Sequence, residues 1–396
     1  MDAAGRLDLI RELCSIEGRG PGTDAERRSA GMLAGRLRAL GRRVEVEPFF
    51  THPQYAVVYL IHAVLAVVGS VLATTQPAIG FALVLIAATS TYLDLNTRFY
   101  LVRSLLFRRA SQNVVSPGGR PDAPARLILA AHYDSAQTGY VFGRPLTMLN
   151  QLPDRARLIF GPFRLFFWAG LAPLLPIIGV RMAGVDATWL SAIQVFPTIA
   201  LIVAAFLLID VALSGVVPGA YDNASGVAAV LSAAEELAAD PPENLDVWVV
   251  LTGSEESLCE GMRAFVRSHS DELDRERTSV VNVDSVSFGP VRWEVSEGGV
   301  INVPLDGDLA GLCEALATAE PRFEAAPMRY SLIDDALPAQ VRKLPAITIT
   351  DGYRAPWYHR DEDVPERVDS QALTRATEFV VSLARLIDRE AGRRAP

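Results

Sequence analysis

Acidic and histidine side chains occur where apolar segments of this 396-residue sequence end, in the motifs AHYDS, GAYDNASG, TGSEES, VNVDS and PWYHRDED. The candidate residues in these motifs are His132, Asp134, Asp222, Glu255, Glu256, Asp284 and His359. Imidazole and carboxylate ligands together suit zinc. Two His with Asp, Asp and Glu can hold a pair of ions if one carboxylate bridges them. The motifs therefore predict a site for two Zn ions.

Adjacent glutamates at a strand end point in different directions. One of Glu255 and Glu256 can therefore bind a metal while the other transfers protons. Each motif alone also has a simpler interpretation: HYD fits a core or turn histidine, and DNASG fits a helix N-cap. The remaining histidines, His52, His62 and His269, are predicted to be non-catalytic.

The segments around these motifs alternate strand candidates with amphipathic helices. Residues 7–40 have the spacing of two helices, and RRVEVEPFF follows as a strand. Further strands are expected at RLILAA, DVWVVLT, SVVNV and PAITIT, with helices at 223–239 and around 261–269. Alternation of this kind predicts an α/β fold with a mostly parallel sheet and helices on both faces. Ligands of such sheets bind beyond the carboxyl ends of the strands, where the motifs lie.

Long uncharged regions interrupt this pattern. Residues 55–93 contain no Asp, Glu, Lys or Arg, and the polar turn TTQP divides this region near its middle. Residues 165–180 and 187–209 are also uncharged. Helices of about 20 apolar residues span a bilayer core. We therefore expect two transmembrane helical hairpins. Buried core helices are the alternative, because some segments are short and Pro173 and Pro176 interrupt one of them.

The hairpins divide the chain into hairpin 1 at 55–95, hairpin 2 at 158–213 and soluble parts at 1–54, 96–157 and 214–396. Each hairpin returns the chain to the side it left, so the soluble parts lie on one face and can form one domain. The flanks on that face hold Arg98, Arg103, Arg108, Arg109, Arg155, Arg157 and Arg164. The positive-inside rule then predicts an integral, multi-pass membrane protein whose domain faces the cytoplasm.

The amino-acid composition limits the classes of binding partner that the protein can have. Half of the residues are hydrophobic and 21% are charged, which excludes disorder and is consistent with a lipid bilayer as partner. The net charge of −9 argues against a nucleic-acid partner. Cys14, Cys259 and Cys313 are odd in number and widely spaced, which indicates reduced thiols and no cysteine zinc site. The first residues lack a basic head and apolar run, so no cleavable signal peptide is expected.

Taken together and in this order, the motifs closely resemble those of metallopeptidase family twenty-eight, which includes co-catalytic zinc aminopeptidases and glutamate carboxypeptidase-like enzymes. The resemblance covers roughly residues 1–54, 110–140 and 216–390. It implies the zinc exopeptidase fold, with the hairpins as insertions of a membrane-inserted member. The second insertion separates His132 from Asp222, which in compact members are much closer in sequence.

The resemblance implies the metal ligands of two zinc sites. His132 and Asp284 would complete one site, Glu256 and His359 the other, and Asp222 would bridge them.

The resemblance also implies catalytic roles. Asp134 would orient His132, Glu255 would be the general base, and Tyr358 would help to bind the oxyanion. The implied reaction is hydrolysis of a terminal bond of a peptide substrate with a free terminus, by a water that two zinc ions activate.

One segment departs from the family pattern. YSLIDDALP, with Asp334 and Asp335, stands where relatives often have a Ser-Asp-His-like segment, so the sequence does not predict specificity. Two other functions stay open: a single-zinc glutaminyl cyclase-like acyl transferase that forms pyroglutamate, and a catalytically dead membrane scaffold. The complete ligand set and the adjacent glutamates favour hydrolysis.

Overall fold

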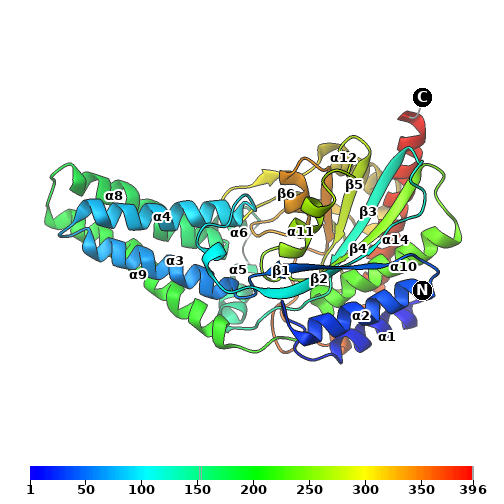
Figure 1. The fold of residues 1–396 in the computed structure, drawn as a ribbon, viewed down its shortest axis with the longest axis horizontal. Helices are drawn as coiled ribbons and strands as arrows, with labels where there is room; N and C mark the ends of the chain where they lie inside the picture. The colour runs from blue at the N-terminus through cyan, green and yellow to red at the C-terminus, as the bar shows by residue number, and fades with distance from the viewer. Residues whose placement is uncertain (151, 153, 395–396) are drawn as a thin grey trace.

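The computed structural model describes residues 1–150, 152 and 154–394, which form an α/β domain with a long helical bundle projecting from one end (Figure 1). One nine-stranded sheet runs through the domain. Its strands are Glu45–Thr51 (β1), Arg109–Ser116 (β2), Ala125–His132 (β3), Leu245–Thr252 (β4), Thr278–Val283 (β5), Arg292–Glu297 (β6), Val303–Pro304 (β7), Ala326–Arg329 (β8) and Ala346–Thr350 (β9).

The sheet is mixed. Its order is β1-β2-β4-β3-β5-β9-β6-β7, with β8 beside β6. The central strands β4, β3, β5 and β9 are parallel, whereas β1–β2, β2–β4, β9–β6 and β6–β7 are antiparallel. The expectation of a mostly parallel sheet is correct for the centre and wrong for β1, β2, β6 and β7, whereas β8 is parallel to β6. Parallel neighbours need a crossover connection, and β7 follows its antiparallel neighbour β6 through a short loop.

Helices cover both faces of the sheet. They are Ala3–Cys14 (α1), Asp24–Ala39 (α2), Ser225–Ala239 (α10), Glu260–Ser268 (α11), Gly307–Ala319 (α12), Ala336–Val341 (α13) and Ser370–Arg394 (α14). Side chains alternate between faces along a strand. In β3, Leu127 and Leu129 therefore join the core beneath α1, α10 and α14, whereas Ile128 joins the core beneath α11 and α13. The centre of the sheet is thus buried on both faces, and every residue of β4 is buried.

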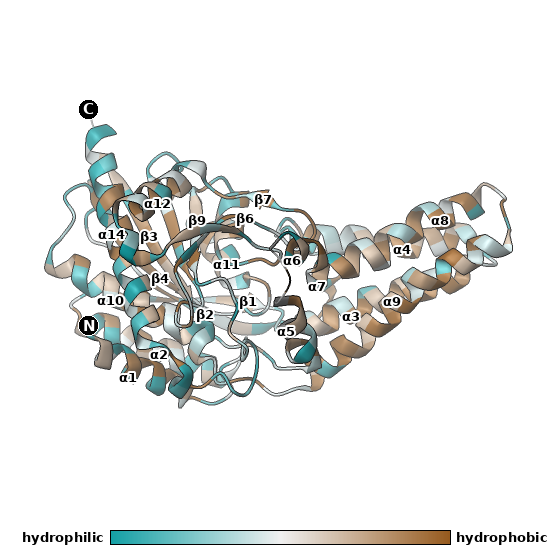
Figure 2. Cartoon of the chain, turned by 180° about the vertical axis from the view of Figure 1, so that it is seen from behind, coloured by the Kyte–Doolittle hydropathy of each residue, from teal (hydrophilic) through white to brown (hydrophobic). Residues whose placement is uncertain are grey.

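The bundle consists of two helical hairpins. Hairpin 1 pairs Tyr55–Leu72 (α3) with Pro77–Leu95 (α4). Hairpin 2 pairs a continuous helix, made of Pro162–Leu165 (α7), the π-helical turn Phe166–Leu171 (η3) and Ala172–Met182 (α8), with Thr188–Leu213 (α9). All four helices are long and apolar enough to cross a membrane. Figure 2 shows mostly hydrophobic residues along both hairpins, with a few hydrophilic ones among them.

A buried ion pair joins hairpin 1 to the domain. Arg103, in the short helix Arg103–Leu105 (η1), has its Nε 2.9 Å from Oδ2 of Asp94 at the end of α4. Its Nη1 donates to the carbonyl of Ser257 at 2.9 Å and lies 3.6 Å from Glu260. All three charged side chains are buried. Since Ser257 directly follows the paired glutamates of TGSEES, this contact links the bundle to the site.

Candidate metal centre

The parallel centre of the sheet brings the sequence motifs to one edge. His132 is the last residue of β3, Glu255 and Glu256 follow β4, and Asp284 follows β5 directly. His359 lies in the loop after β9. Because these strands are parallel neighbours, their carboxyl ends meet, and the predicted residues lie together as the strand-end argument requires.

Two groups of possible metal ligands share Asp222, which precedes α10. One group is His132, Asp222 and Asp284, and the other is Asp222, Glu256 and His359; within each group the ligand atoms lie within 4.8 Å of one another. Asp222 Oδ1 is 3.2 Å from His132 Nε2, whereas Oδ2 is 2.9 Å from His359 Nε2. The two oxygens of one carboxylate thus face separate groups, which is the arrangement that a bridging ligand needs.

The donor atoms fit a pair of divalent cations. Each group combines one imidazole with two carboxylates, a set that suits zinc. Glu256 Oε1 and His359 Nδ1 are buried and have no hydrogen-bond partner among the described residues. Buried polar atoms are normally partnered, so an unpartnered carboxylate oxygen inside a ligand group fits a role in binding a cation.

Glu255 lies beside both groups. Its Oε2 is 3.9 Å from His132 Nε2, and the buried thiol of Cys259 donates to its Oε1 at 3.1 Å. Burial raises the pKa of Glu255 well above its usual value; His132 opposes this rise and the Glu256 carboxylate adds to it. A carboxyl group with a raised pKa is suited to accept and return a proton near neutral pH.

Asp134 supports the loop that carries the two glutamates. Its carboxylate accepts the backbone N–H groups of Glu255 at 3.1 Å and Glu256 at 3.0 Å. Its Oδ1 is also 3.4 Å from His132 Nδ1, the ring nitrogen away from Asp222. One buried carboxylate therefore holds both a predicted ligand and the predicted base, which is consistent with the expected role in orienting His132.

Tyr358 stacks on His359, with ring centroids 4.0 Å apart and planes inclined by 22°. It lines the same cavity as Glu255 and Asp284. The histidines predicted to be non-catalytic have other surroundings. His52 bonds to Glu260, His269 bonds to Glu47 and Glu272, and His62 lies within α3.

Sequence reasoning missed Asp363, which lies four residues after His359. Its buried carboxylate accepts the N–H groups of Tyr221 at 2.7 Å and of Asp222 at 3.1 Å. Burial raises the pKa of Asp363 to about 8. Asp363 thereby fixes the backbone of Asp222, the predicted bridging ligand, to the loop that carries His359. The only sequence signal was its place in the acidic run HRDED.

Arg19 and Glu26 were also missed. Arg19 is buried and donates to the carbonyls of Tyr133 and Gly219, so it joins the loops that carry His132 and Asp222. Glu26 accepts the N–H of Ser254, directly before the paired glutamates, and burial followed by repulsion from Asp134 raises its pKa to about 8.

Neither residue has a sequence signal for this role. Glu26 stands three residues after the N-cap Thr23, where a glutamate is explained by a capping box alone. Arg19 is an isolated arginine between two helices.

The segment YSLIDDALP, which departs from the family pattern, contributes to a second acidic cluster beside the candidate metal centre. Asp334 lies with Glu294 and Glu297 of β6, all buried, with ligand atoms within 4.8 Å of one another. Burial raises the pKa of all three carboxyl groups well above their usual values; repulsion from Asp334 adds to the rise for Glu294 and Glu297, and repulsion from Asp284 adds to it for Asp334. Asp335 accepts a hydrogen bond from the Thr252 hydroxyl, and burial raises its pKa to about 7. Unlike the metal centre, this cluster includes no histidine among the described residues.

Comparison with known proteins finds one family model that matches part of the chain. Residues 209–384 match the model of peptidase family M28. The M28 match includes Asp222, both glutamates of TGSEES, Asp284 and His359, whereas His132 precedes it. No curated protein matches the chain.

Several solved structures are similar to this chain in fold. The Legionella pneumophila LapA aminopeptidase is 12% identical, with a TM-score of 0.53, and the similarity covers 98% of this chain and 72% of that one. A Zn-dependent exopeptidase from Parabacteroides distasonis is 14% identical, with a TM-score of 0.53 and coverages of 96% and 97%. The Fimbriiglobus ruber glutaminyl cyclase is 14% identical, with a TM-score of 0.56 and coverages of 98% and 95%. These likenesses support the predicted zinc exopeptidase-like α/β fold.

Proposed function

We propose that this protein is a membrane-anchored, zinc-dependent exopeptidase of the aminopeptidase type, which hydrolyses terminal peptide bonds at a two-zinc site. The observation that carries the proposal is the position of Asp222, whose two carboxylate oxygens face His132 and His359 separately. The M28 match and the likeness to zinc exopeptidases support a hydrolase with zinc.

The predicted metal ligands form two sets, one for each ion. His132 with Asp284 and Glu256 with His359 would hold the two ions, with Asp222 between them. Zinc, when bound, supplies a Lewis acid that polarises the substrate carbonyl and favours ionisation of water.

The remaining groups handle protons and orientation. Glu255 accepts the proton of the attacking water and returns it to the leaving amine. Asp134 keeps His132 in its orientation, and the hydroxyl of Tyr358 donates to the oxygen on which negative charge develops.

Membrane anchoring is part of the proposal. Protein buries only 17% of the 18-residue apolar window of α9. In the other three helices it buries 33–44% of the corresponding window. Helices this apolar need a second apolar environment, which a bilayer provides. Both hairpins leave from the same end of the domain (Figure 1), and the arginines near their bases favour a cytoplasmic domain.

A glutaminyl cyclase-like transferase is the second candidate, and the likeness to the Fimbriiglobus ruber enzyme favours it. Such an activity would use one zinc, held by the Asp222, Glu256 and His359 group, and would release a cyclised product. The complete second group around His132 favours two ions.

The test measures zinc content and the release of amino acids from short peptides by the purified full-length protein. We expect two zincs per chain, and Glu255→Gln should keep both while activity falls about 10²- to 10⁴-fold. Glu243→Gln, which changes an exposed glutamate of the domain, is the matched control. One zinc with a cyclised product would replace the proposal by the transferase. Neither zinc nor turnover would favour a scaffold.

A further inference from the structure

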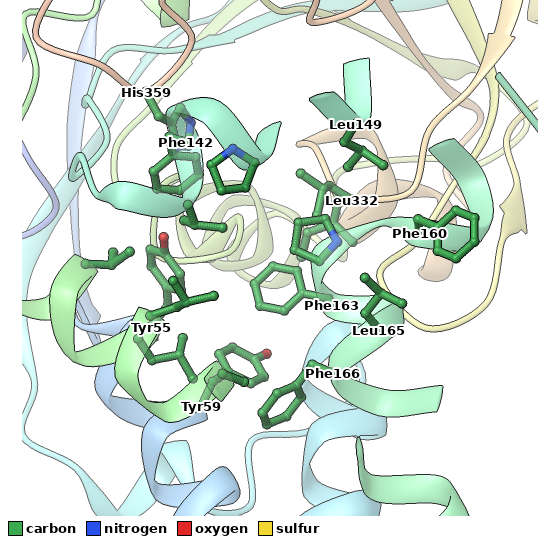
Figure 3. A pocket seen from close by; sticks show the side chains of 18 of the residues that line it. Tyr55, Tyr59, Phe142, Leu149, Phe160, Phe163, Leu165, Phe166, Leu332 and His359 are labelled. Carbon is green, nitrogen blue, oxygen red and sulfur yellow. The ribbon is translucent and has the colours of Figure 1, made fainter. Parts of the chain in front are cut away.

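A cavity of about 770 Å³ connects the metal centre with the helical bundle (Figure 3). One end is formed by Asp222, Glu255, Glu256, Asp284 and His359, which are the charged residues of the site. The other walls come from α3, α7, η3 and α9, and from the short helices Tyr140–Phe142 (η2), Arg144–Asn150 (α5) and Asp154–Phe160 (α6). The volume lies within the range of about 300–1,000 Å³ that is typical of small-molecule sites.

The two ends of the cavity differ in chemistry. Beyond the charged end and the neighbouring Asp334, its described lining residues include no Asp, Glu, Lys, Arg or His. Tyr59 of α3 packs on Phe163 and Phe166 of hairpin 2, with ring centroids 5.0 and 6.0 Å apart, and Figure 3 shows these rings and Tyr55 along this apolar part. An apolar tunnel that ends on a metal centre suits a molecule with one polar and one long apolar part.

The apolar part begins directly at the metal centre. The ring of Phe142 lies 4.5 Å from the ring of His359. Phe142 is held in place because η2 packs on the end of α9, where the N–H of Tyr140 donates to Asp210 at 2.6 Å. A chain lying against Phe142 therefore places its head group beside the predicted zinc ligands.

The mouth of the cavity is also apolar. Met148, Phe160, Leu165 and Val203 line the cavity and are 42–58% exposed, so they form its rim. These residues belong to α5, α6, α7 and α9, at the domain end of hairpin 2. A hydrocarbon chain would pass this rim readily from a bilayer, whereas a polar peptide would have to leave water to do so.

We propose that the cavity holds the hydrocarbon chain of the substrate, so that the substrate is a lipid-linked amide. Its chain enters from the bilayer between α9 and the helices α6 and α7, and its amide reaches the two ligand groups that share Asp222. The inference rests on the proposed hydrolytic function for the reaction. The oxygen of water bonds to the carbonyl carbon, the carbon–nitrogen bond breaks, and Glu255 carries the proton to the leaving amine. The products are a carboxylic acid and an amine, one of which bears the chain.

The first test compares chain lengths. The zinc-loaded, full-length protein in lipid nanodiscs is given leucine ethylamide and leucine dodecylamide, with N-dodecanoyl-leucine for the opposite orientation. We expect kcat/KM for one of the long-chain amides to exceed that for the ethylamide at least about tenfold, because each buried methylene contributes up to about fourfold. Equal or faster hydrolysis of the ethylamide would overturn the inference and leave the proposed function standing.

A pair of variants locates the chain. Ala204→Trp fills the cavity from α9, and Ile202→Trp places the same side chain on the same helix at a residue that does not line the cavity. Ala204→Trp should lower the ratio of long-chain to short-chain kcat/KM at least about tenfold, and Ile202→Trp should keep it. The same ratio in both variants would overturn the inference.

Binding gives a readout that does not depend on turnover. Dodecanoate should bind the metal-free protein, and Ala204→Trp should weaken this binding at least about tenfold while Ile202→Trp does not. Such binding without hydrolysis of any amide by the zinc-loaded protein would support the apolar occupant and overturn the proposed function. Equal binding of dodecanoate by both variants would overturn the inference. A bilayer phospholipid that stays bound in the cavity and that dodecanoate does not displace would also overturn it.

Discussion

The domain and the helical bundle use their apolar residues in different ways. Every residue of β4 is buried within the domain, whereas in α9 a continuous apolar stretch stays largely uncovered by protein. Phe50 in β1 and Phe206 in α9 are nearly equally exposed, at 68% and 67%. Phe50 is an isolated exposed aromatic residue of a kind that soluble domains tolerate. Phe206 belongs to an exposed apolar row with Ile199, Ile202, Val203 and Ile209.

This difference shows that the fraction of apolar residues does not by itself define a core. The domain buries its own core between two layers of helices, and the bundle buries only the seams between its helices. The cavity lies where the two regions meet, with its charged end in the domain and its apolar end in the bundle. Four experiments test how far the regions are separate, beginning with the junction between them.

The largest effect is expected at the junction. Arg103→Leu leaves the carboxylates of Asp94 and Glu260 buried without their cation, and should lower the free energy of unfolding by about 3–5 kcal/mol. Denaturant unfolding in detergent measures this loss. The double variant Arg103→Leu/Asp94→Leu should recover part of it, and Arg98→Leu, at an exposed arginine, should have little effect. If Arg103→Leu unfolds like the wild type, the two regions are not coupled through this pair.

The two exposed phenylalanines give a matched test of their surroundings. Phe206→Glu places a charge on the exposed side of α9, which faces lipid in the proposed membrane arrangement, and should cost up to about 3 kcal/mol of membrane insertion. The measurement is the share of protein in the membrane fraction after alkaline extraction. Phe50→Glu should leave that share unchanged. Equal behaviour of the two variants would remove the distinction between the regions and would contradict the membrane proposal.

Packing inside hairpin 1 depends on a close approach of its helices. A Cβ atom on Gly80 of α4 would lie 2.7 Å from the Cβ of Ala73, and it would also meet the carbonyl oxygen of Gly69 in α3. Gly80→Val should therefore destabilise the bundle by about 1–3 kcal/mol, seen as a lower melting temperature. Gly179→Val is the control, because a Cβ there meets no atom within 4 Å. A stable Gly80→Val variant would show that the two helices can separate freely.

The smallest effect concerns charge in the domain. The hydrogen bond that His269 donates to the Glu47 carboxylate is the main cause that raises the pKa of His269, and partial burial opposes the rise. Because the folded-state pKa is higher than the unfolded-state value, this pairing stabilises the protein fully below about pH 6.5 and the contribution is lost as the pH rises through the folded-state pKa.

His269→Gln should therefore cost less than about 1 kcal/mol of unfolding free energy near pH 5, and almost nothing near pH 9. Unfolding curves at both pH values measure the difference. The cost of Gly80→Val, which changes no charge, should be the same at both. A larger cost of His269→Gln at high pH would show that the sign of the pKa shift is wrong.

Local sequence was enough to predict much of the fold and of the candidate site. The strands ending at His132 and Thr252 could be predicted because a buried strand is a short apolar run that polar residues terminate. Since parallel strands end at one edge, the same pattern also predicted that the metal-ligand candidates would meet. The turn between α3 and α4 was visible because polar residues and a proline interrupt an apolar run.

The supporting residues could not be predicted in this way. Arg19 bonds to Gly219, which is 200 positions later, and Glu26 bonds to Ser254, which is 228 positions later. Asp363 reaches back 141 positions to Asp222. Buried polar groups are identified by their partners, and these partners come from distant segments.

The sequence by itself therefore determined which residues could bind metal and which segments were too apolar for water, because residue chemistry and periodicity are local properties. Only the tertiary structure decided the antiparallel edges of the sheet, the division of the Asp222 carboxylate between two histidines, and the cavity that joins the site to the bundle. Each of these depends on distances between segments that the chain separates by tens to hundreds of residues, and packing sets those distances.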